Sequence, residues 1–352
     1  MKKLSVYNFK RRSVSAVIGL ALGLGLIGGL TGATLAADYK PEYKISTVIG
    51  QPFPWGESAV KWADLVRERS NGRINMKMYP GAQLVAGDQT KEFTAIRQGI
   101  IDMAVGSTIN WSPQVPELNL FSLPFLMPDH KSIDALTQGP VGKKLFEVIA
   151  SKDVVPVAWG ENGFRELSNS KHPVRTPDDM KGLKIRVVGS PLFLDTFTAL
   201  GANPTQMSWA DAQPAFATKA VDGQENPVSI FVAAKLPNVG QNNLTLWGYM
   251  ADPLIFVVNK RVWESFSPED QKIVREAAIE AGKFGIDMGR KGISGSDMSV
   301  IESIKAGGVN VVTLSDAERQ KFVAATREVH NKWKPRIGAD LVDLAEKSIK
   351  GK

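Results

Sequence analysis

Strand-like and helix-like segments alternate along the chain from residue 44 onwards. The pattern predicts strands at residues 45–49, 74–79 and 101–105, with helices at residues 57–70 and about 88–98 between them. Repeated β-α-β units are typical of a parallel sheet covered by helices. We therefore expect an α/β fold, and the length of 352 residues favours two domains.

Two later helix starts are clearly marked. Residues 176–179 and 267–270 each combine a capping side chain, a proline at the first helical position and acids in the first turn. After Pro268 a helical pattern continues for roughly 35 residues, about 50 Å, with glycines from Gly282 to Gly295. The pattern predicts either one long helix with a kink that braces both domains, or two helices with a glycine break.

The first 37 residues have the order of a secretory signal peptide. Five basic residues precede an apolar run at residues 14–30 and a small-residue stretch at residues 31–37. The run contains glycines and is shorter than the roughly 20 residues of a spanning helix, which argues against an uncleaved anchor. We expect cleavage after Ala36 or Ala37 and a periplasmic protein. Arg11-Arg12 fits a twin-arginine signal only loosely, so the ordinary secretory route is favoured.

Charge and cysteine content exclude several classes of function. The formal charge of +7 includes +5 from positions 1–37, which leaves +2 and no argument for nucleic-acid binding. There is no cysteine, so the fold depends on its core rather than on disulfides. The three histidines, His130, His172 and His330, lack the spacing of metal ligands, and we expect no metal site.

No enzyme motif is present outside one misleading match. A G-x-G-x-x-G pattern at Gly23, Gly25 and Gly28 lies inside the leader with no strand before it, so it does not indicate a dinucleotide site. The sequence has no P-loop, no G-x-S-x-G and no H-E-x-x-H. We therefore expect a protein without cofactor and without catalytic activity.

Two arginines are candidates for anion binding. Arg186 lies near the carboxyl end of a strand predicted at residues 184–188, and an arginine at the carboxyl end of a parallel strand faces the crevice where α/β sheets bind ligands. Its planar fork matches a carboxylate bidentately. Arg165 lies in Gly163-Phe164-Arg165, a similar polar position in apolar and glycine-rich surroundings. Pairing with a nearby acid or exposure to solvent is the alternative for either residue.

Four sequence blocks, in this order, resemble the substrate-binding subunits of tripartite ATP-independent periplasmic (TRAP) transporters, in the dicarboxylate-uptake (DctP-like) family. The blocks are residues 162–170, 179–187, 200–205 and 221–227. The resemblance covers nearly the whole chain after the leader, to about residue 334. It implies a periplasmic-binding-protein-like fold with two α/β lobes, a central cleft, interleaved chain crossings and a long helix bracing both lobes.

The resemblance also implies boundaries for these lobes. We expect residues 38–162 and 252–291 to form lobe I, and residues 163–251 and 292–352 to form lobe II. Family members are commonly monomeric, and we expect the same here.

The resemblance assigns roles to single residues. Arg186 matches the arginine that forms a two-pronged salt bridge with the ligand carboxylate, and Arg165 matches a second arginine that contacts the ligand. Asn226 matches an asparagine that donates to the same group, while Gln224 and Glu225 are expected to hold the loop. Eight further positions are Trp209 against the ligand body, Ser107, Asn110 and Trp111 at its far end, Trp247 and Tyr249 beside the cleft, and Phe53 and Trp55 at its mouth. Core packing is the alternative for every aromatic residue among them.

The ligand class stays open between a monocarboxylate and a C4-dicarboxylate. A glutamate often found after the aromatic position is replaced by Ala210-Asp211-Ala212, and residues 107–111 carry no charge for a second carboxylate. The expected mechanism is hinge closure around a small organic anion, which is then delivered to the small and large TRAP membrane components. A binding protein of an ATP-driven importer, a ligand-sensing subunit and a periplasmic enzyme are the alternatives.

Overall fold

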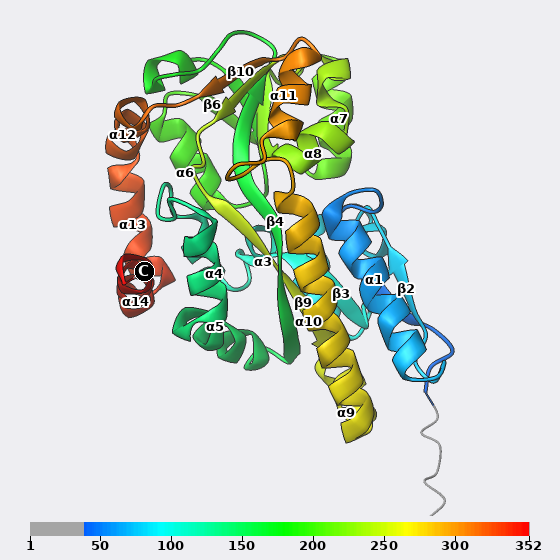
Figure 1. The fold of residues 1–352 in the computed structure, drawn as a ribbon. Helices are drawn as coiled ribbons and strands as arrows, with labels where there is room; N and C mark the ends of the chain where they lie inside the picture. Colours follow the sequence, from blue (N-terminus) through cyan, green and yellow to red (C-terminus); the bar gives the residue numbers. More distant parts are fainter. Residues whose placement is uncertain (1–38, 352) are drawn as a thin grey trace, which may run out of the picture. The chain divides into compact units, whose positions relative to one another are not determined.

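The computed structural model describes residues 39–351 (Figure 1). The expected leader, its cleavage after Ala36 or Ala37 and the glycine motif at residues 23–28 lie outside the described residues. Among the described residues, no helix is both long enough and apolar enough to cross a membrane.

Ten strands form one connected sheet within residues 39–351. Its main path runs β2 (Met76–Tyr79), β1 (Tyr43–Ser46), β3 (Met103–Ser107), β9 (Ala251–Asn259), β4 (Val154–Asn169), β7 (Gly223–Pro227), β5 (Lys184–Val187) and β6 (Asn203–Gln206). Off this path, β8 (Asn243–Leu246) pairs with β4 and with β10 (Asn310–Thr313).

The sheet is mixed rather than purely parallel. Strands β1, β2 and β3 pair in parallel, as do β5, β6 and β7, and this agrees with the β-α-β pattern of the sequence. Strand β9 runs antiparallel to β3 and β4, and β4 runs antiparallel to β7 and β8. The expectation of a parallel sheet is therefore wrong for these central strands. We call β1, β2, β3 and β9 the first half of the sheet and β5, β6, β7, β8 and β10 the second half. Strands β4 and β9 carry the chain between these halves in opposite directions, which makes the centre of the sheet antiparallel.

Strand β4 belongs to both halves of the sheet. Its first part, to Phe164, pairs with β9, and its last part, from Arg165, pairs with β7. The change of partner follows a register shift between Glu161 and Gly163, and Gly163 has a positive φ of 123°. Arg165 therefore stands where the strand passes from one half of the sheet to the other.

Fourteen helices cover the sheet in the described part of the chain. They are α1 (Pro54–Arg69), α2 (Glu92–Gln98), α3 (Thr108–Trp111), α4 (His130–Gln138), α5 (Pro140–Ala150), α6 (Pro191–Ala199), α7 (Trp209–Ala217), α8 (Val228–Ala233), α9 (Lys260–Ser265), α10 (Pro268–Arg290), α11 (Ser299–Ala306), α12 (Asp316–Ala325), α13 (Arg327–Ile337) and α14 (Ala339–Lys350). Short 3₁₀ turns occupy Gln83–Val85, Gln89–Lys91, Pro116–Ser122, Pro177–Met180 and Leu236–Val239.

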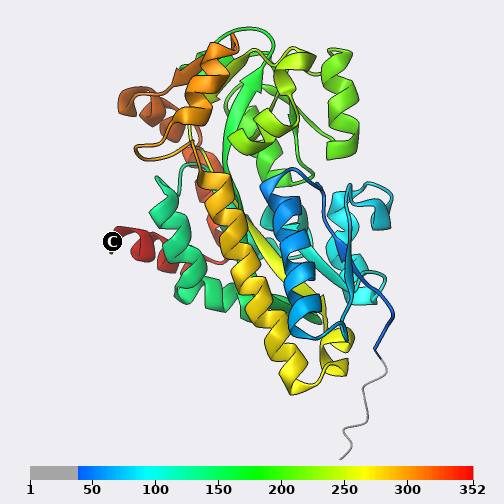
Figure 2. The same ribbon diagram turned by 45° about the vertical axis from the view of Figure 1, so that its right-hand side comes forward.

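Capping signals locate helix starts correctly but do not set helix length. Ser267 accepts a hydrogen bond from the Asp270 amide and begins α10, which lies beside α1 in both views (Figure 2). The helix ends at Arg290, because Lys291 is extended and Gly292 has a φ of 76°. The prediction of one helix of about 35 residues is therefore wrong, and the alternative of two helices with a glycine break is confirmed. Thr176 caps only a single 3₁₀ turn.

Two large apolar clusters pack the first half of the sheet. One lies between the sheet and helices α1 and α10. The other contains α4 and α5 together with Val329, Trp333 and Val342 from the C-terminal helices α13 and α14. Two further clusters pack the second half, around α6 and around α7 and α8. The chain thus crosses between the halves several times, while the lobe boundaries expected from the sequence stay a prediction.

Candidate functional site

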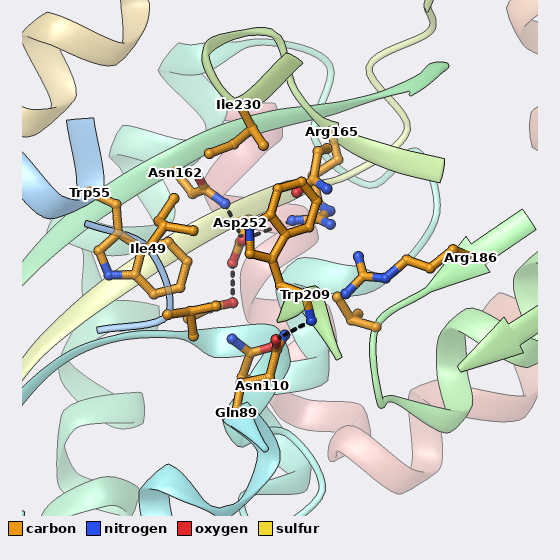
Figure 3. Close-up of a pocket in the computed structure, with 14 residues that line it drawn as sticks. Ile49, Trp55, Gln89, Asn110, Asn162, Arg165, Arg186, Trp209, Ile230 and Asp252 are labelled. Atoms are coloured by element: carbon orange, nitrogen blue, oxygen red, sulfur yellow. Dashed lines mark hydrogen bonds and ion pairs between the residues drawn. The ribbon is translucent and has the colours of Figure 1, made fainter. Parts of the chain in front are cut away.

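A cavity of about 30 Å³ lies between residues of both halves of the sheet (Figure 3). Seven of the expected site residues line it, namely Trp55, Ser107, Asn110, Arg165, Arg186, Trp209 and Asn226. Seven lining residues were not expected, namely Val48, Ile49, Gln89, Asn162, Val188, Ile230 and Asp252.

Arg186 is a buried cation with no acid bonded to it. It lies near the carboxyl end of β5, as the strand pattern predicts, and its side chain is 1% exposed. Its Nε and Nη2 atoms donate to the Met207 carbonyl at 3.0 and 2.8 Å, and it forms no ion pair with any residue of 39–351. Burial lowers the pKa of Arg186 to about 10. Two of its five N–H groups are used, so three remain for a ligand.

Arg165 is held almost completely by the protein. Its Nε and Nη2 bond the Glu225 carboxylate, and Nη2 also donates to the Glu225 carbonyl at 2.8 Å. Its Nη1 donates to Asp252 at 3.1 Å. Four of its five N–H groups are therefore used, and one on Nη1 remains. Glu225 thus holds Arg165 in place, whereas the sequence led us to expect that it holds a loop; residues 223–227 form strand β7 instead.

Asn226 lies at the end of a chain of amide hydrogen bonds. Its Nδ2 donates to Gln224 Oε1 at 2.5 Å, and Gln224 Nε2 donates to Ser168 Oγ at 2.8 Å. These bonds fix the side chain of Asn226 at the cavity wall. An amide group offers both donor and acceptor atoms, and one donor of Asn226 remains free for a ligand.

Asp252 is the only acid among the residues that line the cavity. Its Oδ1 accepts from Ser107 Oγ at 2.5 Å, and its Oδ2 accepts from Asn162 Nδ2 at 2.8 Å and from Arg165. Burial raises the pKa of this carboxyl, against the opposing effects of Arg165, Asn162 and Ser107. Its signal in the sequence is a lone acid at the start of the apolar strand β9.

The cavity wall also holds four polar side chains, Gln89, Ser107, Asn110 and Asn162, and the remaining lining side chains are apolar. The apolar side chains are Val48, Ile49, Val188, Ile230 and the indole rings of Trp55 and Trp209. Trp55 Nε1 donates to the Val105 carbonyl at 2.7 Å, so its ring is oriented by the backbone of β3. The Arg186 guanidinium lies 5.7 Å from the ring centre of Trp209.

Four expected site residues do not line the cavity. Trp111 is buried against Phe93, with the two ring centres 5.5 Å apart. Trp247 and Tyr249 are buried with their ring centres 4.6 Å apart, and Tyr249 reaches the site only through a 2.8 Å hydrogen bond to Glu225. Phe53 is half-buried beside the start of α1. For these four residues the cavity is out of direct reach, because core packing already holds their rings.

No group of three or more histidine and acid side chains within residues 39–351 is arranged to hold a metal ion. The arrangement suits binding of an anion: Figure 3 shows Arg165, Arg186, Asp252 and Trp209 converging on one region.

Comparisons with known proteins agree with this geometry. Residues 45–336 match the family described as "Bacterial extracellular solute-binding protein, family 7" (DctP). The 2,3-diketo-L-gulonate-binding periplasmic protein YiaO of Escherichia coli K12 is 34% identical over 297 residues, which cover 82% of this chain and 86% of that protein.

Solved structures of TRAP binding proteins share the fold. One from Ralstonia eutropha H16, with bound (S)-2-acetolactate, is 63% identical, has a TM-score of 0.89, and is matched over 89% of this chain and 100% of its own. The sugar acid binding protein of Advenella mimigardefordensis, in complex with galactonate, is 28% identical, with a TM-score of 0.82 over 88% and 98% of the two chains.

These matches confirm the expected two-lobe α/β fold and the resemblance found in the four sequence blocks. The chain belongs to the DctP family of TRAP periplasmic solute-binding proteins, which bind small organic acids.

Proposed function

We propose that this protein binds a small monocarboxylic acid in the cavity, with Arg186 as the main partner of the carboxylate. The observation that carries the proposal is the state of Arg186, which is buried and has no acid partner among the described residues. A buried charge with no directly bonded counter-charge is costly, and a ligand carboxylate offsets that cost. Arg165 and Asn226 supply further donors to the same group.

A single carboxylate suits the cavity better than two. Arg165 and Arg186 are the only cations among the lining residues, and Glu225 and Asp252 already compensate Arg165. The rest of the wall is apolar or carries neutral polar groups apart from Asp252, so a second carboxylate would be buried without a charged partner. The Ralstonia eutropha relative binds (S)-2-acetolactate, an acid with one carboxylate and a short branched body. We infer a ligand of similar size for this chain.

We propose that binding is coupled to closure of two lobes around the ligand. In this proposal the lobes are residues 38–162 with 252–291 and residues 163–251 with 292–352, and strands β4 and β9 carry the hinge. Closure excludes water and strengthens the charge-assisted hydrogen bonds at Arg186. The closed, monomeric protein then delivers the acid to the small and large TRAP membrane components, and no chemistry is done on it.

Export is part of the same proposal. The basic, apolar and small-residue segments of positions 1–37 act as a signal peptide, and cleavage after Ala36 or Ala37 releases the protein into the periplasm.

A thermal-shift screen of the purified protein tests the proposed ligand class. The panel contains short monocarboxylates, 2-oxo and 2-hydroxy acids, succinate, sugar acids, amino acids and neutral sugars. A ligand that binds only the folded protein adds about 2.7 kcal/mol of stability at a hundredfold excess over its dissociation constant. We expect the largest shifts from short monocarboxylates. Shifts confined to amino acids or neutral sugars would overturn the proposal, and consumption of a bound acid would indicate an enzyme.

Replacement of Arg186 by alanine tests the residue itself. We expect Arg186→Ala to cost about 2–5 kcal/mol of binding free energy, because a buried carboxylate then lacks its partner. This corresponds to about a 30-fold to several-thousand-fold rise in the dissociation constant measured by calorimetry. Arg186→Lys should restore only part of the affinity, since it lacks the planar fork. The exposed Arg97 on α2 provides the matched control, Arg97→Ala. Equal affinities of Arg186→Ala and wild type would contradict the assignment.

A further inference from the structure

Asp252 lines the cavity, but an ionised carboxylate has no proton to donate to a ligand carboxylate. Its side chain is 1% exposed, and an acid is the least suitable group to place beside a second anion. Its hydrogen bonds must therefore serve a purpose other than direct contact with the ligand carboxylate.

One acceptor position of Asp252 remains free. A carboxylate accepts about four hydrogen bonds, two on each oxygen. Oδ2 accepts from Asn162 and from Arg165, while Oδ1 accepts only from Ser107. Ser107 has no proton left to donate to a ligand, because its hydroxyl proton goes to Asp252, and its oxygen already accepts from the Ile109 amide at 3.1 Å.

This free position lies next to the proposed carboxylate site. Arg165 Nη1 donates one of its N–H groups to Asp252 Oδ2 at 3.1 Å, and its other N–H group is the one that remains for a ligand. A ligand carboxylate that accepts from Nη1 places its neighbouring carbon beside Asp252. With an acid that has no donor on that carbon, the ligand carboxylate and Asp252 would share Arg165 Nη1 but form no hydrogen bond with each other. A hydroxyl group there would donate to Oδ1 and offset the repulsion between the two carboxylates.

We propose that Asp252 accepts a hydrogen bond from a hydroxyl group on the carbon next to the ligand carboxylate, so that the site selects 2-hydroxy acids. The inference rests on the proposed function and names the residue that determines specificity within it. The apolar wall of Ile49, Ile230 and Trp209 then holds a short hydrocarbon body.

Three acids with one carbon skeleton test the proposal by titration calorimetry on the purified protein. They are 2-hydroxy-3-methylbutanoate, titrated as each of its two enantiomers, 3-methyl-2-oxobutanoate and 3-methylbutanoate. Only the hydroxy acid can donate to Asp252. Since a hydrogen bond to a charged group contributes about 1.5–3 kcal/mol, we expect one enantiomer to bind roughly 10- to 100-fold more tightly than the other two acids.

The variant Asp252→Asn gives the sharper result. Asn162 and Arg165 both donate to the Oδ2 position, so the amide oxygen should take that place and the NH₂ group should replace Oδ1. An NH₂ group donates to a ligand oxygen instead of accepting from a hydroxyl. The preference for the hydroxy acid should then disappear or pass to the oxo acid, while 3-methylbutanoate should bind as well as before or better. Asp102→Asn, at a buried acid outside the cavity, is the matched control.

Each contrary outcome is distinct. If wild type binds the three acids equally, or the oxo acid most tightly, the proposal is wrong, and no variant is needed to show it. Equal loss of all three acids in Asp252→Asn would mean that Asp252 only positions Arg165. Failure of the proposed function looks different: wild type would bind none of the acids, or Arg186→Ala would leave all affinities unchanged.

Discussion

Two buried glutamates outside the cavity carry unusual pKa values. Burial raises the pKa of Glu92 to about 7, against a hydrogen bond from Ser46, and its Oε2 has no hydrogen-bond partner. Burial also raises the pKa of Glu166 to about 7, although the Trp247 and Gly248 amides donate to it. Both groups hold a proton more tightly in the folded chain than in the unfolded chain.

The sign of the resulting pH dependence follows from proton binding. Between the ordinary glutamate pKa of 4.5 and about 7, the folded chain binds more protons at Glu92, so its contribution to stability falls as the pH rises. Glu92→Gln removes this contribution. We expect the free energy of unfolding of the variant, minus that of wild type, to increase with pH by up to about 1.4 kcal/mol per pH unit between pH 5 and 7.

Urea unfolding at pH 5, 6 and 7 measures this difference. The exposed Glu147→Gln is the matched control and should follow wild type at every pH. Parallel curves for Glu92→Gln and wild type would show that Glu92 titrates normally.

At the scale of single elements, the glycines of α10 have different surroundings. A Cβ on Gly282 would lie 2.3 Å from the backbone oxygen of Trp159 in β4, whereas a Cβ on Gly289 would lie no closer than 3.8 Å to Pro54. The helix thus packs closely on β4 at Gly282, and the sequence pattern of regularly spaced glycines does not reveal which position needs the space.

Alanine at these two positions tests the close approach. Gly282→Ala should lower the free energy of unfolding by about 1–3 kcal/mol, because the backbone of β4 cannot move aside without loss. Gly289→Ala is the matched control and should be neutral or stabilising by up to about 1 kcal/mol, since alanine favours helix. Thermal or urea unfolding measures both. Equal effects of the two substitutions would contradict the proposed packing constraint.

At the scale of the whole binding protein, Gln89 joins the two halves of the sheet beside the cavity. It precedes α2 in the first half, and its Oε1 accepts from the amide of Trp209, which follows β6 of the second half, at 3.0 Å. Its Nε2 donates to Asn110 at 2.8 Å. Gln89 also lines a neighbouring hollow of about 640 Å³, so it borders both the small cavity and this larger space.

Loss of this bridge should weaken binding through faster release. Gln89→Ala removes one neutral hydrogen bond across the halves, worth about 0.5–1.5 kcal/mol, so we expect a roughly 2- to 10-fold higher dissociation constant. Stopped-flow measurement should place most of the change in the dissociation rate. The exposed Gln83→Ala in the same segment is the matched control. An unchanged dissociation rate in Gln89→Ala would contradict a role in retaining the ligand.

The sequence by itself determined the α/β class, the position of Arg186 near the end of its strand, the start of α10 and the family. These depend on local order: hydrophobic period, capping residues and motif blocks that stand together in the chain. Arg165 and Asn226 were likewise found from their blocks, and both line the cavity.

Only the tertiary structure decided which other side chains meet at the cavity. Asn162 and Asp252 are 90 positions apart, and Ser107 and Asp252 are 145 apart, yet they share hydrogen bonds. Trp209 lines the cavity, whereas Trp111 and Trp247 are packed in the core. The sequence does not distinguish these cases, because a buried tryptophan suits a core and a ligand wall equally well. The physical reason is that side-chain contacts between distant segments depend on how the two halves of the sheet are joined, and no local pattern records that arrangement.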